Sequence, residues 1–236
     1  MPFCALCETQ VDAWLPHPHA DARSPLMVMM GTVGSDLQHY LCPHCGCNDR
    51  DRHLWLYLTV SGLADRMKGA RILHIAPEAK VAPLIAARHP AEYIRGDLFP
   101  TSPEFLRVDC ERMEFPDDSF DLIICNHVLE HVSDPEAASR EFHRTLVPDG
   151  YLVAQTPYVP TLKFRLEFIG GISPEQARFF YGQEDHVRLF GRDVADCIRS
   201  SGLEGNLFPH EHVLPQHDAA HYGCNPLEPF FLFTKK

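Results

Sequence analysis

Residues 106–157 read LRVDCERMEFPDDSFDLIICNHVLEHVSDPEAASREFHRTLVPDGYLVAQTP, and this stretch decides the fold. Two apolar runs, 120–125 and 151–154, flank a segment with a helical pattern at 134–146. Such runs predict buried strands, and the strand–helix–strand order predicts that they are parallel. Ligands of open sheets bind beyond the carboxyl ends of the strands. We therefore expect one crevice surrounded by the polar residues at these ends: Asp109, Asn126, His127 and residues 156–158.

The same alternation extends in both directions along the chain. Strands are predicted at 70–75, 92–94 and 106–108, and a crossover helix at 81–88. A later helix is expected at 192–201, where Gly202 ends it. The segments 203–213 and 230–234 are predicted as a final antiparallel pair. The fold class is therefore α/β.

Composition narrows the class of protein. The 236 residues are 45% hydrophobic, which suits one mid-sized core with a small appendage. A net charge of -11 argues against a nonspecific nucleic-acid binder, which would be basic. No apolar run reaches the roughly 18 residues that span a bilayer, and the start MPFCALCETQ does not resemble a signal peptide. We expect a cytoplasmic protein without membrane partners, whose nine cysteines are thiols or metal ligands.

Paired cysteines mark residues 1–50 as a separate unit. Cys4 and Cys7 are separated by two residues, as are Cys42 and Cys45. This spacing lets both thiolates of a pair reach one zinc ion, so we predict a structural zinc ribbon with these four ligands. Four residues could replace one of the ligands: Cys47, His17, His19 and His44. The alternative is four unrelated cysteines.

A helix is predicted at 48–67. Residues 51–69 would link the zinc ribbon to the sheet. Gly69 ends it. Arg50 and Arg52 lie near its start, where they either face solvent or reach over the ligand pocket.

The motif FPDDSFDLIICNHVLEHVSDP, followed by LVPDGYL, resembles class I S-adenosylmethionine-dependent methyltransferases of the type 11 and ubiquinone-type group. The resemblance covers about residues 71–236. Within this group the chain looks like a branch whose members also begin with paired cysteines and have an IAPE loop, here residues 75–78. It implies a Rossmann-like seven-stranded sheet in a domain at 70–236, S-adenosylmethionine as cofactor, and an acceptor-side insert near 159–190.

The resemblance also implies cofactor-binding residues. The usual glycine-rich loop after the first strand is replaced here, because Ala76, Glu78 and Lys80 occupy the glycine positions. Glu78 would hold the cationic amino group of the cofactor, and Asp97 the ribose hydroxyls. The full set of implied cofactor residues is Ala76, Pro77, Glu78, Asp97, Asp109, Cys110 and Asn126. The alternatives are a turn without ligand at 76–78 and a turn-capping aspartate at Asp97.

Catalytic candidates follow from the same resemblance and from charge patterning. His127 lies at the strand end that faces the sulfonium, and the sequence DHVR places His186 and Arg188 on one face of an extended segment. Histidine suits proton transfer near neutral pH. His127, Glu130 and His131 resemble a trio that holds a divalent metal in ubiquinone-type enzymes, although a structural pair of Glu130 and His131 is the other interpretation. DHVR could equally anchor the helix after it.

The expected reaction is methyl transfer to a hydroxyl, amine or thiol of a small molecule or glycan. Two alternatives remain: a binding protein that lost the cofactor, and a zinc-ribbon adaptor on a methyltransferase-like scaffold.

Overall fold

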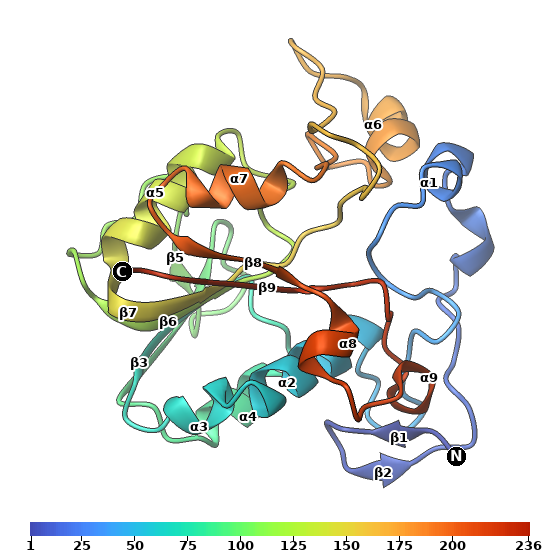
Figure 1. Cartoon of the computed structure of the whole chain (residues 1–236), viewed down its shortest axis with the longest axis horizontal. Helices are drawn as coiled ribbons and strands as arrows, with labels where there is room; N and C mark the ends of the chain where they lie inside the picture. The colour runs from blue at the N-terminus through green and yellow to red at the C-terminus, as the bar shows by residue number, and fades with distance from the viewer.

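The computed structural model describes residues 1–236 except the side chain of Ala22. A seven-stranded sheet in the order β5-β4-β3-β6-β7-β9-β8 forms its centre (Figure 1). Neighbouring strands from β5 to β7 are parallel, whereas β9 is antiparallel to both of its neighbours. The strands are β3 (Arg71–Ile75), β4 (Glu92–Asp97), β5 (Leu106–Arg107), β6 (Phe120–Cys125), β7 (Leu146–Val153), β8 (Glu204–Phe208) and β9 (Phe230–Thr234). The α/β class and the seven-stranded sheet are confirmed.

Helices cover both faces of the sheet (Figure 1). α5 (Pro135–Thr145) and α7 (Val194–Arg199) pack on one face over a core that includes Phe142 and Ile198. α2 (Asp49–Val60), α3 (Leu63–Arg66) and α4 (Ala82–Ala86) cover the other face. Burial on both faces explains why β6 is apolar without alternation.

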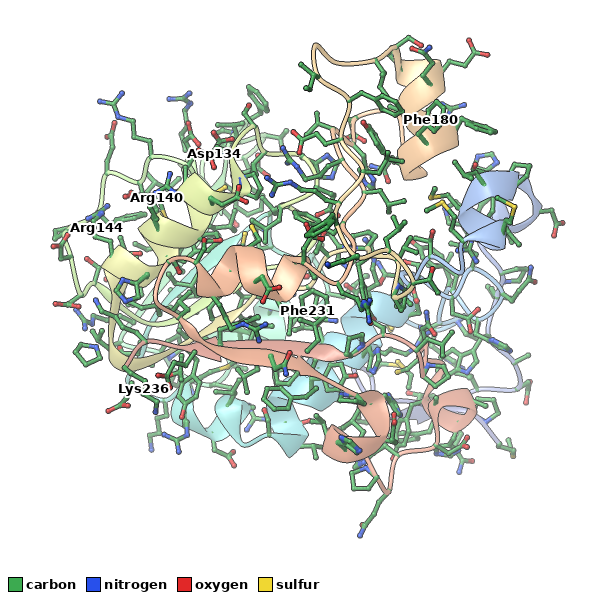
Figure 2. All side chains as sticks on the ribbon, turned by 45° about the horizontal axis from the view of Figure 1, so that its top comes forward. Asp134, Arg140, Arg144, Phe180, Phe231 and Lys236 are labelled. Atoms are coloured by element: carbon green, nitrogen blue, oxygen red, sulfur yellow. The ribbon has the colours of Figure 1, made fainter. Side chains whose placement is uncertain are left out.

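Capping chemistry sets the limits of α5. The Asp134 carboxylate accepts the Ala137 amide at 2.8 Å, and Pro135 occupies the first turn. His143 and Arg144 lie in the last turn, where positive charge complements the helix dipole. Figure 2 shows Asp134, Arg140 and Arg144 placed along this helix. The helix predicted at 134–146 is confirmed to within one residue at each end.

α2 begins with a reciprocal cap, because the Asn48 side chain accepts the Asp51 amide while the Asp51 carboxylate accepts the Asn48 amide. The single helix predicted at 48–67 is interrupted by Gly62, whose φ of +79° ends α2 and begins α3. α2 is buried around most of its circumference, so it lies inside the molecule rather than on a linker surface.

Shorter elements surround the sheet. They are β1 (Phe3–Cys4), β2 (Thr9–Gln10), the 3₁₀ helix η1 (Ala20–Ala22), α1 (Pro25–Met29), α6 (Pro174–Tyr181), α8 (His210–Val213) and α9 (Ala219–Tyr222). α1 and α6 pack together in a small apolar cluster away from the sheet, and Figure 2 shows Phe180 in this lobe. None of the helices in the described part of the chain has the length and apolarity needed to cross a bilayer.

The N-terminal segment has a small apolar cluster of its own, with Cys4, Val11, Trp14, Cys42 and Cys47. It also contacts the C-terminal third of the chain, because Trp14 donates from Nε1 to the Ala220 carbonyl at 3.3 Å and Val33 forms a β-bridge with Tyr158. Only the first cysteine pair lies on a hairpin, formed by β1 and β2.

Candidate active site

A cavity of about 1180 Å³ opens at the carboxyl ends of β3 and β6. The sheet edge contributes Ala76, Glu78, Asn126 and His127 to its wall. Parts of the segment from His17 to Asp51 and of the segment from Glu175 to His186 form the remaining walls. This volume exceeds that of most small-ligand pockets, so it has room for a nucleoside cofactor together with an acceptor.

Glu78 is the anionic group at the sheet edge. Its Oε2 lies 2.6 Å from His74 Nε2, and its Oε1 accepts the Asn126 side-chain amide at 3.1 Å. His74 is fully buried and its Nδ1 is 2.9 Å from the Tyr93 hydroxyl. Burial acts to raise the pKa of Glu78, but the charge and hydrogen bond of His74 outweigh it and hold the pKa below its ordinary value. Glu78 is therefore ionised at neutral pH.

Ala76 takes the backbone conformation for which glycine is usually needed. Its φ is +48°, in the left-handed region, directly after β3. Its amide donates to the Gly96 carbonyl at 2.8 Å, which continues the sheet for one more residue. A non-glycine residue tolerates this conformation at a cost of about 1–2 kcal/mol. The turn that would approach a ligand is thus kept although the glycines are absent.

The two predicted aspartates lie at the same edge of the sheet but outside the cavity wall. Asp97 ends β4, and its Oδ1 accepts the Phe99 amide at 2.8 Å. Asp109 follows β5, and its Oδ1 accepts the Glu111 amide at 3.0 Å. Pro77 and the buried Cys110 are likewise not among the residues that line the cavity. The structure therefore brings Ala76, Glu78 and Asn126 together, and places the other predicted cofactor residues beside them along the sheet edge.

His127 is the most constrained residue of the cavity. Its φ is +54°, and its amide donates to the Gln155 carbonyl at 2.6 Å. The ring lies between two buried carboxylates, with Nδ1 3.5 Å from Glu130 Oε1 and Nε2 3.9 Å from Glu228 Oε1. Within the described residues, Nδ1 makes no hydrogen bond. Strained polar residues of this kind are typical of functional sites.

Glu130 forms the floor beneath His127. Its Oε2 accepts the Thr156 hydroxyl at 2.8 Å. Burial acts to raise its pKa, but the adjacent ring of His127, followed by the charges of His186 and His131, lowers the pKa to about 2. This carboxylate therefore stays charged throughout the physiological pH range.

The trio His127, Glu130 and His131 is not assembled as the resemblance implied. The side-chain ligand atoms of Glu130 and His131 lie within 4.8 Å of those of His186, and His127 is outside this group. The rings of His131 and His186 meet edge to face, with centroids 4.7 Å apart. Glu130 contacts Thr156, and His131 Nδ1 contacts the Asp185 carbonyl at 3.2 Å.

His186 lies beside Glu130 and His131, on the segment that packs against the loop after β6. Its Nδ1 is 3.1 Å from the Tyr181 carbonyl, which must accept, so this nitrogen carries hydrogen and leaves Nε2 as the basic atom. Burial lowers the pKa of His186. The ring is therefore neutral at pH 7 and can accept a proton in the cavity.

Arg188 does not have the catalytic position that we predicted. It is 1% exposed and absent from the cavity wall. Its guanidinium donates to the carbonyls of Leu129, Val132 and Ser133 and pairs with the Glu167 carboxylate. These contacts fix the loop after β6, so Arg188 holds Glu130 and His131 in place from behind.

Five cysteines gather beside the first turn of α2. Four sulfurs lie within 4.8 Å of one another, those of Cys4, Cys42, Cys45 and Cys47. The fifth, Cys7, lies at the margin with its Sγ 3.9 Å from that of Cys42. Cys47 thus takes the place in the group that the pair spacing assigned to Cys7. A turn at Gly46, with φ +70°, brings Cys47 back to the cluster.

The donor set fits a tetrahedral zinc ion. Cys4 Sγ lies 3.8 Å from Cys45 Sγ and 3.5 Å from Cys47 Sγ. Four thiolates about 2.3 Å from one zinc ion would be separated by roughly 3.8 Å. A hydrogen bond from Cys47 lowers the pKa of the Cys4 thiol to about 4, although burial opposes this. Burial raises the pKa of Cys42, and the hydrogen bond with Cys4 raises the pKa of Cys47, so among these thiols Cys4 is the one that favours thiolate, the form that binds metal.

Arg52 connects this cluster to the rest of the fold. Its buried guanidinium donates to the carbonyls of Cys47, His39 and Gly223, and stacks 4.0 Å from the Trp14 ring centroid. Arg50, two residues earlier, points instead to the cavity. Arg50 therefore reaches the pocket, as one of the two interpretations predicted. Arg52 is neither solvated nor in the pocket, so neither interpretation holds for it.

Comparison with known proteins fits this geometry. Residues 59–154 match the family model of a methyltransferase domain. This part of the chain is a methyltransferase domain. It spans the sheet from β3 to β7 and contains Ala76, Glu78, Asp97, Asp109, Asn126 and His127.

Relatives align with less than a third of the chain. The uncharacterized methyltransferase YcgJ of Bacillus subtilis is 36% identical over 69 residues, which are 29% of this chain and 27% of YcgJ. Phosphoethanolamine N-methyltransferase 3 of Arabidopsis thaliana is 32% identical over 69 residues, 28% of this chain and 14% of that protein. The chain therefore spans about a quarter or less of these relatives. A Mesorhizobium loti S-adenosylmethionine dependent methyltransferase superposes with a TM-score of 0.49 at 19% identity, covering 76% of this chain and 98% of that one.

Sequence reasoning did not assign three polar residues near the site. Asp49, His53 and Glu228 all lie outside residues 59–154. Glu228, on the C-terminal loop, lies 3.9 Å from His127 behind the cavity wall, His53 contacts Glu228 from α2, and Asp49 is buried near Glu228. Their neighbours in sequence, such as Pro226 and Leu227, form no recognisable motif. Only the tertiary fold brings these residues together.

Proposed function

We propose that the chain transfers a methyl group from S-adenosylmethionine to a hydroxyl, amine or thiol of a small molecule or glycan. The observation that carries this proposal is the ionised Glu78 at the cavity rim, inside a methyltransferase domain. When bound, the cofactor supplies an electrophilic methyl group on a sulfonium. An anion held by His74 and Asn126 suits its cationic amino group.

The remaining roles follow the order of the strands. Because β3, β4 and β5 are parallel neighbours, Asp97 and Asp109 lie in line with Glu78 along the sheet edge. We assign Asp97 to the ribose hydroxyls and Asp109, with the Cys110 amide, to the adenine. Asn126 would position Glu78, and Ala76 and Pro77 would form the turn beneath the methionine part.

His127 and His186 are the proposed acceptor-side bases. They line the same cavity and both lie beside Glu130, so an acceptor in front of them could lose a proton to either ring. Arg188 takes no part in this step and acts as a positioning residue. The cysteine cluster, through a zinc ion, would keep the N-terminal wall of the cavity in place.

Calorimetry with S-adenosylhomocysteine and the full chain tests the proposal. We expect binding, and about tenfold to hundredfold weaker binding in Glu78→Gln, because a hydrogen bond to a charged group contributes roughly 1.5–3 kcal/mol. Glu204→Gln, the same chemical change on strand β8, serves as the matched control and should bind like the native chain.

Absence of binding by the native chain would favour the alternative of a binding or adaptor protein without cofactor. Binding that is equally strong in Glu78→Gln would remove Glu78 from the site while leaving the activity open to a labelled-methyl assay. That assay, with tritiated S-adenosylmethionine and pooled hydroxyl, amine and thiol compounds, then identifies the acceptor class.

A further inference from the structure

A chain of buried polar groups runs from the cavity floor to the far side of α2. His127 Nε2 lies 3.9 Å from Glu228 Oε1, and the other oxygen, Oε2, lies 3.0 Å from His53 Nδ1. His53 Nε2 is 2.8 Å from His210 Nδ1, and His210 Nε2 is 3.1 Å from the His217 carbonyl. His53 is fully buried, and Glu228 and His210 are nearly so.

The contacts fix how many protons this chain holds. The His217 carbonyl can only accept, so His210 Nε2 must donate. The contact between His210 and His53 needs one further hydrogen, and the contact between His53 and Glu228 needs another. Two neutral imidazoles carry only two hydrogens, and three are required. Glu228, His53 and His210 therefore share one excess proton, which makes the trio neutral overall.

Surrounding groups support this arrangement. The Tyr57 ring stacks on His53 at 4.2 Å, and its hydroxyl donates to the Glu228 backbone carbonyl at 2.6 Å. Burial acts to raise the pKa of Glu228, but His53, His127 and Arg50 lower it below its ordinary value. Asp49 faces the same carboxylate, Glu130 faces His127 from the other side, and Glu211 and His217 lie beside His210. Burial and the charge of His53 lower the pKa of His210, so the excess proton rests on His53, between Glu228 and His210.

From this geometry we infer that Glu228, His53 and His210 form a proton relay, which accepts from His127 the proton released during methyl transfer. The inference rests on the proposed function. As the acceptor heteroatom bonds to the methyl carbon, the carbon–sulfur bond breaks and its electron pair stays on sulfur. The heteroatom's proton passes to His127 Nε2, and once the ring turns toward Glu228 it passes on to Oε1. His53 then gives its Nε2 proton to His210 Nδ1, so the trio gains one proton and its imidazolium charge moves from His53 to His210.

The 3.9 Å gap between His127 and Glu228 is longer than a hydrogen bond. Contacts of this kind in ligand-free sites are often long and shorten when substrate binds. A displacement of the ring by about 1 Å would bring Nε2 into hydrogen-bond range. The relay is therefore closed by the same motion that would seat an acceptor against His127.

Nitrogen NMR of histidine-labelled full chain tests the relay without cofactor or acceptor. Signals are assigned with single His→Gln variants. We expect one excess proton shared by His53 and His210 at pH 7, and we expect the His53 signals to move as His127 titrates, because coupling between sites is reciprocal. Glu228→Gln should abolish both effects, whereas Tyr57→Phe, which keeps the carboxylate, should retain them.

His53 signals that stay constant through the His127 titration would overturn the relay, as would two neutral imidazoles in the native chain. The native-chain measurement stands alone if Glu228→Gln does not fold. With an acceptor from the labelled-methyl assay, Glu228→Gln should lower kcat about tenfold or more and change its pH profile, while cofactor affinity stays within about twofold. A failure of cofactor binding would instead count against the proposed function, since the titration does not depend on it.

Discussion

The cysteine cluster and the Glu228–His53–His210 relay lie on two sides of α2. Arg52 contacts the cluster, and the next residue, His53, belongs to the relay. Both are buried and polar, but they differ in how their charge is balanced. Hydrogen bonds to other protein groups join Glu228, His53, His210 and the His217 carbonyl, whereas the cysteines mainly face one another. A buried polar cluster is stable only when it is satisfied, so the chain itself holds the relay together and the cysteines need an ion.

The largest expected effect tests which cysteines are needed. Cys47→Ser should lose bound zinc and destabilise the fold by more than about 4 kcal/mol, because metal loss belongs to the severe class of changes. Cys7→Ser, the matched control at the margin of the cluster, should retain one zinc per chain. Metal content by atomic absorption and thermal unfolding measure both. Zinc lost from Cys7→Ser but kept by Cys47→Ser would restore the pairing that the spacing alone predicts.

Arg52→Lys should have the next largest effect. A lysine cannot reproduce the fork that contacts the Cys47, His39 and Gly223 carbonyls, and each unsatisfied buried acceptor costs about 1–3 kcal/mol. We expect a loss of about 3 kcal/mol in urea unfolding. Arg178→Lys, on the exposed side of α6, is the control with little change. An unaffected Arg52→Lys would show that the cluster and the sheet domain are energetically independent.

The relay should respond to His53→Gln with a loss of about 2 kcal/mol at pH 7, because Glu228 would keep a buried charge with one partner removed. The folded-state pKa of Glu228 is below its ordinary value, so its stabilising contribution is present above about pH 4 and is lost as pH falls. The difference between the native chain and His53→Gln should therefore shrink below that pH. A difference that is constant with pH would contradict the ion pair.

Asp49→Asn should give the smallest effect, and with the opposite sign. Burial, followed by the charge of Glu228, raises the pKa of Asp49 to about 7, and its Oδ1 has no partner among the described groups. A raised carboxyl pKa means that stability is lost as pH rises toward 7. The variant should gain about 1 kcal/mol at pH 8 and nearly nothing at pH 5. Equal melting shifts at the two pH values would argue against this assignment.

The sequence was sufficient where periodicity alone decides the structure. The run at 120–125 became β6 with the predicted bounds, because a strand buried on both faces is apolar without alternation, Asp121 being its one polar residue. The turn chemistry at Asp134 fixed α5 equally well. Residues 148–150, which separate the expected helix from the next apolar run, lie within β7, where Asp149 takes a φ of +61° and the register with β6 shifts between Phe120 and Leu122.

The site was less predictable because its parts are far apart in sequence. Glu78, Asn126 and His127 follow strands and could be inferred, but Glu228 meets His53 across 175 positions. Arg188 was misassigned because a buried guanidinium that supports a loop and one that binds a substrate have the same signature in sequence. The sequence favoured Cys7 over Cys47 as a zinc ligand, because the spacing of the pairs does not show how the chain turns at Gly46.

The contacts of Trp14 and Arg52 with residues 220–223 have a consequence for biosynthesis. A ribosome makes Trp14 206 positions before Ala220, at about 5–20 residues per second. During that interval Trp14 has no carbonyl to bond and the Arg52 guanidinium lacks two of its acceptors. The cysteine segment thus reaches its final packing only when residues 220–223 have emerged, and early capture of a metal ion would keep the nascent cysteines from reacting elsewhere.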